Sequence, residues 1–378
     1  MITRLYAHNF RSLVNFEITF EQLALLMGAN GAGKSSVLDV LQRLVSYLAD
    51  GAKVEDVFPS TDFTRWNRHV APVQRFELDV TCKGHPYHYE LEIDHNPDRH
   101  MLRMSRESLS CDGKGLFSFS VENGNGEAQL YRDDGSAGPK YPFDWSQSGV
   151  GFMQPRHDNR LLTAFRERMA SVFVVRPAPQ IMRAESRREL KRPDLLMEDF
   201  ASWLRYLMQE HQGRVYELTS VLRRVIPRFS SFSLREAGDA RMLHVEVRSP
   251  GDALDLCRFD SLSHGERMLI ALYTLLGCMP DEDVTICIDE PENFLALPEV
   301  QPWLDALRDR LEEHDTCQAL LVSHHPRLIN FLTAAKAGVW LSRKGDLGPS
   351  NAVTVSPDAS KDGIPVADLI ERGWLYDA

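Results

Sequence analysis

Three separated groups of residues have the types and spacing needed to handle the phosphates of a nucleotide. The first is Gly28-Ala-Asn-Gly-Ala-Gly-Lys-Ser35, which has the G-x-x-x-x-G-K-S spacing of a phosphate loop. Its glycines let backbone N–H groups turn inward around phosphates, Lys34 adds a positive charge, and the Ser35 hydroxyl can ligate Mg²⁺. The sequence therefore predicts that ATP and Mg²⁺ bind here, with these residues in contact: Gly28, Asn30, Gly31, Gly33, Lys34, Ser35 and Ser36.

Two carboxylates follow an apolar run later in the chain. Val284 to Ile288 is typical of a parallel strand buried on both faces, and it ends in Asp289-Glu290. Ligands of open α/β sheets bind at the carboxyl ends of the strands. Asp289 is therefore predicted to hold Mg²⁺, and Glu290 to polarise the attacking water as general base. An apolar strand that ends in acids is common by itself, so the functional interpretation depends on the phosphate loop upstream.

The third group, Ser263-His-Gly-Glu266, precedes an apolar helix expected from Arg267 to Leu276. A serine followed three residues later by glutamate is a capping box, which is the purely structural explanation. Capping does not require Gly265, however. A glycine at this place lets a helix N-terminus approach an anion closely. Ser263 and Gly265 could therefore contact a γ-phosphate, which would come from a second copy of the chain because each phosphate loop carries its own nucleotide.

Strands and helices in the expected order position these groups. Leu23 to Met27 is predicted as a buried strand and Ser35 to Leu48 as an amphipathic helix, which gives the phosphate loop its strand–loop–helix context. This context argues against a glycine-rich turn that binds nothing. Four strand-like stretches are predicted to form an antiparallel β-lobe: 75–82, 87–93, 101–109 and 116–121.

Composition limits the class of protein. The chain has 378 residues, of which 43% are apolar, and a formal net charge of −11. No stretch approaches the roughly 20 apolar residues needed to span a bilayer, and six cysteines lack C-x-x-C spacing. These features predict a soluble, cytoplasmic protein with free thiols and no membrane partner. Nothing between the phosphate loop and Leu262 sustains heptads, which excludes long coiled-coil arms.

Positive charge is concentrated between Arg156 and Arg192, where ten Lys or Arg residues stand against four acids. The segment leads into helices expected over 197–209 and 214–225. Such a strip could bind nucleic acid phosphates with steep salt dependence. A solvated helix face that balances an acidic protein is the alternative, and the sequence leaves both open.

A family resemblance joins these motifs. The chain resembles the ABC-type ATPases of the RecF, SMC and overcoming-lysogenization-defect group, and especially their small standalone members. Besides the motifs above, the resemblance rests on Ile2-Thr-Arg, Phe10-Arg-Ser-Leu13, Cys287-Ile-Asp-Glu-Pro-Glu-Asn293, Gln301-Pro-Trp303, Ser323-His-His-Pro326 and Arg372-Gly-Trp374. It implies an α/β P-loop NTPase fold: an ABC-type ATPase head with an antiparallel β-lobe and an inserted helical lobe.

The resemblance also implies roles for residues. It implies a head-to-tail homodimer with two ATP molecules, in which Ser263, Gly265 and Glu266 of one copy lie at the nucleotide held by the other. His324 matches the switch histidine that contacts the γ-phosphate, although a packed histidine at a strand end is the commoner outcome. Gln154 is the candidate for the glutamine that senses Mg²⁺. Glu266 stands where ABC transporters usually have glutamine, which favours the DNA-associated branch.

We expect three segments: an ATP-binding lobe with the β insertion over 1–155, a helical and basic lobe over 156–260, and a second lobe over 261–378. Three functions fit this organisation. The first is an ATP-gated dimer that switches a separately encoded effector, as in anti-phage defence. The second is a RecF-like repair ATPase that binds DNA directly, and the third, disfavoured by the signature residues, is a transporter ATPase subunit.

A second active site is not expected. His85, His88, His95 and His100 lie on predicted strands and turns without ligand spacing, so they are predicted to be surface histidines rather than metal ligands. The acids near the end, among them Asp358, Asp362 and Asp368, do not form a clustered nuclease motif.

Overall fold

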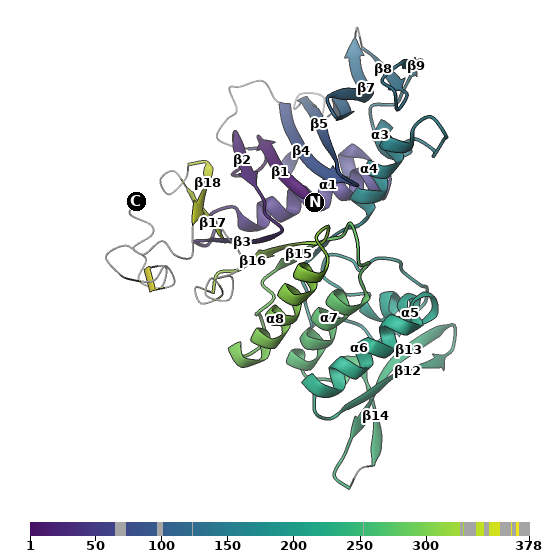
Figure 1. The fold of residues 1–378 in the computed structure, drawn as a ribbon, viewed down its shortest axis with the longest axis vertical. Helices are drawn as coiled ribbons and strands as arrows, with labels where there is room; N and C mark the ends of the chain where they lie inside the picture. Colours follow the sequence, from purple (N-terminus) through teal and green to yellow (C-terminus); the bar gives the residue numbers. More distant parts are fainter. Residues whose placement is uncertain are drawn as a thin grey trace. The chain divides into compact units, whose positions relative to one another are not determined.

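The computed structural model describes residues 1–64, 73–96, 101–122, 124–251, 253–325, 328, 338–343, 348–355, 364, 368 and 369. The chain divides into two compact units (Figure 1). Unit 1 comprises Met1–Val172, Asp283–Thr285 and Thr316–Ala378, and unit 2 comprises Phe173–Glu282 and Ile286–Asp315. Both are assembled from separated stretches, so they do not coincide with the segments 1–155, 156–260 and 261–378, whose division into lobes stays a prediction.

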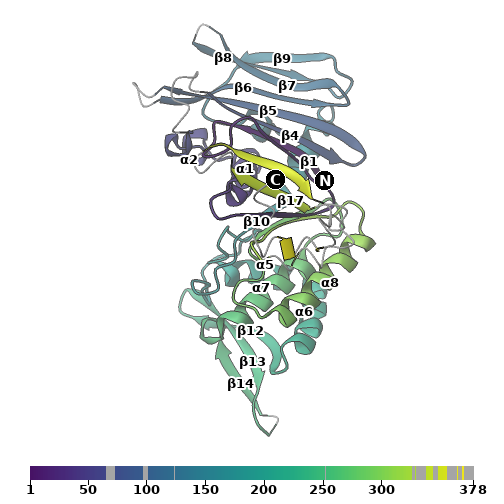
Figure 2. The same ribbon diagram turned by 90° about the vertical axis from the view of Figure 1, so that its left-hand side faces the viewer.

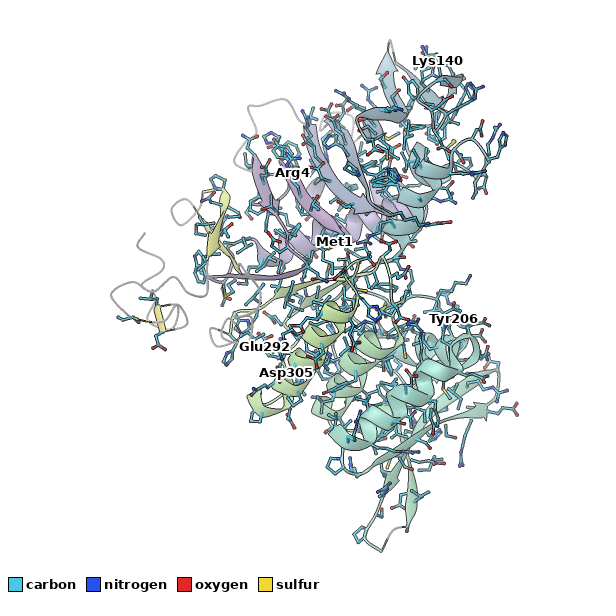
Figure 3. All side chains as sticks on the ribbon, in the orientation of Figure 1. Met1, Arg4, Lys140, Tyr206, Glu292 and Asp305 are labelled. Atoms are coloured by element: carbon cyan, nitrogen blue, oxygen red, sulfur yellow. The ribbon has the colours of Figure 1, made fainter. Side chains whose placement is uncertain are left out.

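An eight-stranded antiparallel sheet forms much of unit 1, in the order β2-β1-β4-β5-β6-β7-β8-β9 (Figure 2). It includes all four strands predicted from the sequence, and β8 and β9 extend it. Its strands are β1 Ile2–His8, β2 Phe16–Thr19, β4 Val73–Cys82, β5 His85–Asn96, β6 Met101–Cys111, β7 Lys114–Glu122, β8 Asn125–Tyr131 and β9 Ala137–Pro142. Alternating burial along β4 places one face of this sheet in the core. On the other face, Arg4 of β1, labelled in Figure 3, bonds Glu17 and Glu77.

A second group of strands in unit 1 has the order β16-β3-β17-β18. β3 (Leu23–Gly28) pairs in parallel with both β16 (Gln318–Val322) and β17 (Gly338–Arg343), and β18 (Ser350–Val355) pairs antiparallel with β17. These strands confirm the predicted buried strand before the phosphate loop. The helices of unit 1 are α1 Lys34–Ala49, α2 Val54–Val57, α3 Gly149–Phe152 and α4 Arg160–Ala170, with the 3₁₀ turn η1 Ser60–Asp62.

The described part of unit 2 contains four helices, of which α6, α7 and α8 lie side by side (Figure 1). They are α5 Phe200–Glu210, α6 Gln212–Val225, α7 His264–Cys278 and α8 Leu297–Glu313. The helices predicted over 197–209, 214–225 and 267–276 are thereby confirmed. Trp303 of α8 is buried and its indole N–H donates to the Leu272 carbonyl of α7. The Gln301-Pro-Trp303 motif therefore ties α8 to α7. None of the described helices is long and apolar enough to cross a membrane.

The predicted helical lobe also contains strands. In unit 2, β12 (Phe229–Ala237) and β13 (Ala240–Arg248) form an antiparallel hairpin, flanked by β11 (Glu185–Ser186) and β14 (Leu254–Arg258). Ala237 pairs with Ala240, so the connection is the two-residue turn Gly238-Asp239, with Gly238 at a φ of 64°. A two-residue Gly-Asp loop between strand-like runs is a hairpin signal that the sequence interpretation missed. The remaining elements are β10 Val172–Val175, β15 Thr285–Asp289 and the 3₁₀ turn η2 Phe259–Ser261.

A buried carboxylate fixes the start of α3 in unit 1. Glu107 is fully buried, and its carboxylate accepts hydrogen bonds from Tyr89 Oη (2.9 Å), Ser148 Oγ (2.5 Å) and the Gly149 N–H (2.7 Å). Ser148 is the N-cap of α3 and accepts from the Gly151 N–H. Burial raises the pKa of Glu107 to about 7, against the partial offset of these donors. The carboxyl group is therefore the ionisable centre that holds this turn in place.

We expect the Glu107→Gln protein to lose part of the pH dependence of stability. Between the ordinary value of 4.5 and about 7, folded Glu107 keeps a proton that the unfolded chain releases. The contribution of Glu107 to the free energy of unfolding is therefore complete below about pH 4.5. It is lost as the pH rises through 7, which lowers the free energy of unfolding by on the order of 3 kcal/mol. Thermal melting from about pH 5 to pH 8 measures this, with surface Glu127→Gln as the control. A wild-type slope retained in Glu107→Gln contradicts it.

Candidate nucleotide-binding site

The phosphate loop connects β3 to α1 in unit 1, as predicted. Gly28, Gly31 and Gly33 have φ values of 146°, 78° and 106°, which side-chain-bearing residues rarely adopt. A Cβ on Gly28 would stand 2.2 Å from the Leu341 carbonyl oxygen, so β17 also requires a glycine there. Lys34 Nζ donates to the carbonyl oxygens of Gly28 (2.6 Å) and Ala29 (3.1 Å). The Lys34 ammonium group therefore lies against the carbonyl oxygens of its own loop. Phosphate oxygens of a nucleotide, if bound there, would take the place of these carbonyl oxygens.

The Phe10-Arg-Ser-Leu13 motif braces this loop. Arg11 contacts Asp39 on α1 and donates from Nε to Asp62 (2.7 Å). Ser12 Oγ accepts from Ser350 Oγ at 2.8 Å, and both hydroxyls lie within 3.1 Å of the position of a Cβ on Gly33. The motif therefore supports the first turns of α1 and the last glycine of the loop. This gives a physical reason for its presence beside a phosphate loop.

His324 lies at the same edge of the sheet as the phosphate loop. It follows β16, whose Val322 pairs in parallel with Leu26 of β3, and the Ser323 N–H donates to the Leu26 carbonyl at 3.1 Å. Ser323 is buried, whereas the His324 side chain is exposed. The structure therefore brings the carboxyl ends of β3 and β16 together, and with them the loop and the histidine. Pro326 and Arg372-Gly-Trp374 lie outside the described residues.

The two predicted carboxylates lie in unit 2, at the end of β15. Asp289 is buried, and its Oδ2 accepts from both Nε and Nη2 of Arg176 at 2.7 Å. The Asp289 carboxylate is therefore paired with a positively charged group, the Arg176 guanidinium, so a cation can be accommodated beside it. A carboxylate oxygen such as those of Asp289 is a hard ligand of the kind that Mg²⁺ prefers, so the chemistry of this side chain suits that metal.

Glu290 occupies a strained turn. Its φ is 54°, an uncommon value for a residue with a side chain, and Asn293 Nδ2 donates to Glu290 Oε2 at 2.5 Å. The Asn293 N–H also donates to the Glu290 carbonyl at 3.1 Å. Asn293 therefore fixes the orientation of the predicted general base within its own loop.

Ser263 forms the predicted capping box of α7. Ser263 Oγ accepts from the Glu266 N–H at 3.3 Å, and Glu266 Oε2 accepts from the Ser263 N–H at 3.1 Å. Arg228 adds a bidentate contact to Glu266, at 2.6 and 2.8 Å. These hydrogen bonds, with Arg228 the largest contributor, lower the pKa of Glu266. Glu266 thus has a complete structural role in orienting the helix N-terminus.

Gly265 lies against the loop that follows Glu290. A Cβ on Gly265 would stand 3.2 Å from the Phe294 carbonyl oxygen, a tight contact. The neighbouring His264 ring meets the Phe294 ring edge-on, with centroids 5.7 Å apart. Phe294 is 49% exposed and has a φ of 69°. Unit 2 therefore joins the N-terminus of α7 and the loop after β15 into one surface, and close packing is a second reason for a glycine at 265.

Gln154 does not lie with the phosphate loop. Gly151, three residues earlier, packs on the Tyr47 and Leu48 carbonyls at the C-terminal end of α1, so closely that a Cβ would stand 2.6 Å from Leu48 O. Lys34 begins the other end of α1, about 20 Å away at 1.5 Å per residue. The Gln154 side chain is exposed and its carbonyl accepts from Asn159 Nδ2 at 3.0 Å. Gln154 as a magnesium sensor stays a prediction, which the position of Gly151 does not favour. Arg176 is a polar residue that contacts the Asp289 carboxylate.

The basic segment from Arg156 to Arg192 is divided between the two units, and most of its arginines make internal contacts. The partners are Asp158 for Arg156, the Met153 carbonyl for Arg166, Thr285 for buried Arg168, Asp289 for Arg176, Glu198 for Arg183, Glu185 and Asp239 for Arg187, and the Phe173 ring for Arg192. Most arginines of this segment therefore already have partners within the protein, without nucleic acid.

The histidines are held by protein partners. His85 and His88 pair through Nδ1 with Asp112 (2.7 Å) and Asp79 (2.5 Å), as surface histidines do. His95 was predicted at the surface and is instead buried, with Nε2 2.9 Å from Gln74 Oε1; burial lowers its pKa to about 4. The ligand atoms of His85, Cys111 and Asp112 lie within 4.8 Å of one another, in a group dominated by the His85–Asp112 pair. His100 lies outside the described residues.

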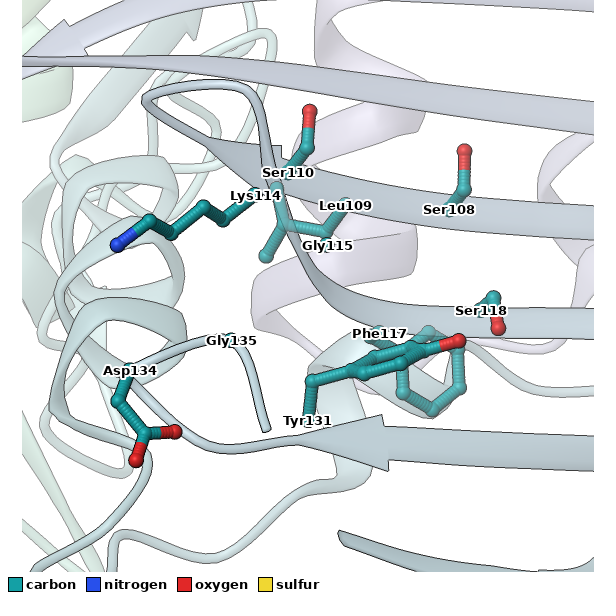
Figure 4. Close-up of a pocket in the computed structure, with 10 residues that line it drawn as sticks. All are labelled: Ser108, Leu109, Ser110, Lys114, Gly115, Phe117, Ser118, Tyr131, Asp134 and Gly135. Carbon is teal, nitrogen blue, oxygen red and sulfur yellow. The ribbon is translucent and has the colours of Figure 1, made fainter. Parts of the chain in front are cut away.

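A hollow on the antiparallel sheet is a poor match for a nucleotide. It measures about 460 Å³ and is lined mainly by small hydroxyl and apolar side chains of β6, β7 and β8, including the Tyr131 ring (Figure 4). Lys114 and Asp134, both drawn in Figure 4, supply opposite charges at its side. The phosphate loop remains the candidate site.

Comparison with solved structures defines the class of fold. The Smc head bound to the C-winged helix domain of ScpA is similar over 94% of this chain and 98% of that chain, with a TM-score of 0.54 and 16% identity. The SMC head domain from Thermotoga maritima is similar over 94% and 99%, with a TM-score of 0.46 and 14% identity. The similarity to the Smc head bound to ScpA, with its TM-score of 0.54, shows the fold of a P-loop ATPase head like that of SMC proteins, which confirms the predicted α/β class.

Sequence comparisons identify the family. A model described as an AAA ATPase domain matches residues 1–98, and one described as "AAA domain, putative AbiEii toxin, Type IV TA system" matches residues 137–330. The second match covers more than half of the chain, so the chain belongs to that family. The chain is also 21% identical over 344 residues to an OLD nuclease of Thermus scotoductus, and this match covers 86% of the chain. The chain spans 59% of the length of that relative. The predicted resemblance to ABC-type ATPases of the SMC and OLD-like group is confirmed.

Proposed function

We propose that the chain binds and hydrolyses ATP and that ATP, held between two copies, switches it between a monomer and a dimer. The observation that carries this proposal is the phosphate loop between β3 and α1, with its three left-handed glycines and the adjoining end of β16. Family membership as an AAA ATPase supports it.

Each proposed role follows from a group described above. Mg²⁺, when bound, would neutralise phosphate charge, with Ser35 and Asp289 as its protein ligands. Lys34 would turn from the Gly28 and Ala29 carbonyl oxygens to the phosphates. Glu290 would accept a proton from the attacking water, and His324 would donate to the γ-phosphate oxygen from the neighbouring strand end. The remaining nucleotide contacts proposed from the sequence are Asn30 and Ser36.

The surface that would meet the second copy is the N-terminus of α7 with the loop after β15. Ser263 supplies a hydroxyl and α7 supplies N–H groups for the partner's γ-phosphate, and Phe294 is a half-exposed aromatic on the same surface. We propose that the dimer signals to a separately encoded effector in a toxin-like or anti-phage system in the cytoplasm. The family, which is described as a putative AbiEii toxin of a Type IV TA system, and the similarity to an OLD nuclease support this proposal.

Direct DNA binding is the second candidate, and the arginine contacts weigh against it. Arg187 and Arg188 line a hollow of about 420 Å³ in unit 2 that also contains Glu185 and Asp199, so its charge is mixed. Charge reversal at both arginines, tested by DNA binding at several salt concentrations, decides this candidate. ATP-dependent DNA binding that is abolished by the reversal would favour it.

We expect the Lys34→Ala protein to bind ATP about 10- to 100-fold more weakly, because it loses a charge-assisted contact to phosphate. Titration of a fluorescent ATP analogue with Mg²⁺ measures this. Lys140→Ala, a change in an exposed ion pair with Glu127, is the matched control and should bind as the wild type does. Equal affinity in the two variants would remove Lys34 from the site.

A further inference from the structure

Arg176 makes a direct contact in unit 2 with a residue of the proposed site. Two nitrogens of its guanidinium, Nε and Nη2, both lie 2.7 Å from Oδ2 of Asp289. This is a charge-assisted contact with fixed geometry, stronger than an ordinary surface ion pair. The carboxylate that Mg²⁺ would use is thus held by a cation belonging to the chain.

The fold places Arg176 there through its backbone. Arg176 follows β10, which pairs with β15, so both residues stand at the ends of neighbouring strands. The Arg176 N–H donates to the Leu195 carbonyl at 2.6 Å, and Pro177 and Pro179 restrict the chain that follows. The main chain at this position is therefore restrained by a hydrogen bond and by the prolines that follow it, whereas the side chain has rotatable bonds of its own.

The two partners differ in burial. The Asp289 side chain is 4% exposed, whereas that of Arg176 is 40% exposed. A buried carboxylate without a cation is costly, so Asp289 needs one in every state of the protein. The arginine, by contrast, already reaches solvent and can rotate outward at little cost. The contact is suited to an exchange of cations.

We propose that Arg176 is a built-in counter-ion that occupies Asp289 until Mg²⁺ arrives, and that metal binding requires its guanidinium to leave. This inference rests on the proposed function and deepens it, since it assigns the regulation of metal entry to one side chain. Arg176 is a positioning residue: it holds the Asp289 carboxylate in a fixed orientation in the nucleotide-free chain. It also sets a threshold, because the metal has to compete with a cation already in place.

Metal affinity tests the exchange directly. Mn²⁺, a paramagnetic substitute for Mg²⁺, is titrated by electron paramagnetic resonance into the wild type, Arg176→Gln and Arg183→Gln, without nucleotide. Arg183, seven residues later in the same unit, is exposed, pairs with half-buried Glu198 and is the matched control. Asp289→Asn in each background isolates the binding that depends on Asp289. We expect Arg176→Gln to bind Mn²⁺ about fivefold to tenfold more tightly, as the loss of a competing ion pair implies.

Stability gives a second readout that does not need turnover. Without a cation, Asp289 should lower the melting temperature of Arg176→Gln, and Mn²⁺ should restore more of it than in Arg183→Gln. Arg176→Lys, which keeps the charge, should lie between the wild type and Arg176→Gln. Equal Asp289-dependent affinity in Arg176→Gln and Arg183→Gln, or no Asp289-dependent Mn²⁺ binding in either, overturns the inference. Binding of a fluorescent ATP analogue by the same wild-type preparation judges the proposed function separately.

Discussion

The Glu290→Gln protein is expected to hydrolyse ATP about 10²- to 10⁴-fold more slowly than the wild type and to accumulate as a dimer in ATP and Mg²⁺. Glutamine keeps the size of the side chain and its contact with Asn293 but cannot accept the proton of the attacking water. ATP binding is spared because Glu290 is not proposed to hold phosphate or metal. Light scattering after size exclusion should then give twice the 43.0 kDa mass of one chain.

The control for this variant is Glu282→Gln, which changes an exposed glutamate of the same unit just before β15. It should retain wild-type turnover and mass. An unaltered turnover rate in Glu290→Gln would show that another group acts as the base. A mass that does not respond to ATP, in a protein that binds the analogue, would show that the dimer is constitutive or does not form. Addition of the product of a neighbouring gene to the same measurement would identify an effector by co-migration.

The sequence predicts the elements around the nucleotide well, because their local patterns and their packing agree. The run Leu23 to Met27 is apolar and short, and it becomes a strand buried between β16 and β17. Ser263 and Glu266 form a capping box in sequence and in structure, since the hydrogen bonds that define it are local. Where short-range chemistry determines the conformation, single-sequence patterns suffice.

The sequence predicts poorly where a residue's role depends on distant packing. Gln154 has the right residue type and follows a Gly-Phe-Met run, yet the preceding glycine packs at the far end of α1. Arg176 has no motif around it, and its contact with Asp289 spans 113 positions of the chain. Only strand pairing in the sheet brings β10 beside β15. Glu107 is a similar case, since nothing local marks it as a fully buried carboxyl group.

The described contacts add a structural role to one predicted site residue, Gly265. The sequence explains Gly265 by close approach to an anion, and the structure adds close approach to the Phe294 carbonyl. Both can hold, because a helix N-terminus packed tightly against the loop after Glu290 moves with that loop. A γ-phosphate bound at Ser263 would then change the orientation of Glu290, the proposed general base, in the same unit. This is a physical route by which dimer formation could be linked to hydrolysis.

The Ser263→Arg protein, made in the Glu290→Gln background, is expected to bind ATP normally and to remain monomeric at concentrations where Glu290→Gln alone is a dimer. An arginine at the N-cap places a long side chain over the first turn of α7, where the partner's phosphate would lie. It also opposes the positive end of the helix dipole and loses a cap worth about 1 kcal/mol. Titration with the ATP analogue and light scattering measure the two properties independently.

Ser220→Arg is the matched control, since Ser220 is exposed on α6 of the same unit and its hydroxyl donates to the Tyr216 carbonyl of its own helix. Ser220→Arg should dimerise as the parent protein does. The cost of the lost cap is checked by melting, because a loss of about 1 kcal/mol leaves most of a domain's stability intact. If Ser263→Arg still doubles its mass with ATP, the signature residues do not face a second copy, and Ser263 serves as a helix cap alone.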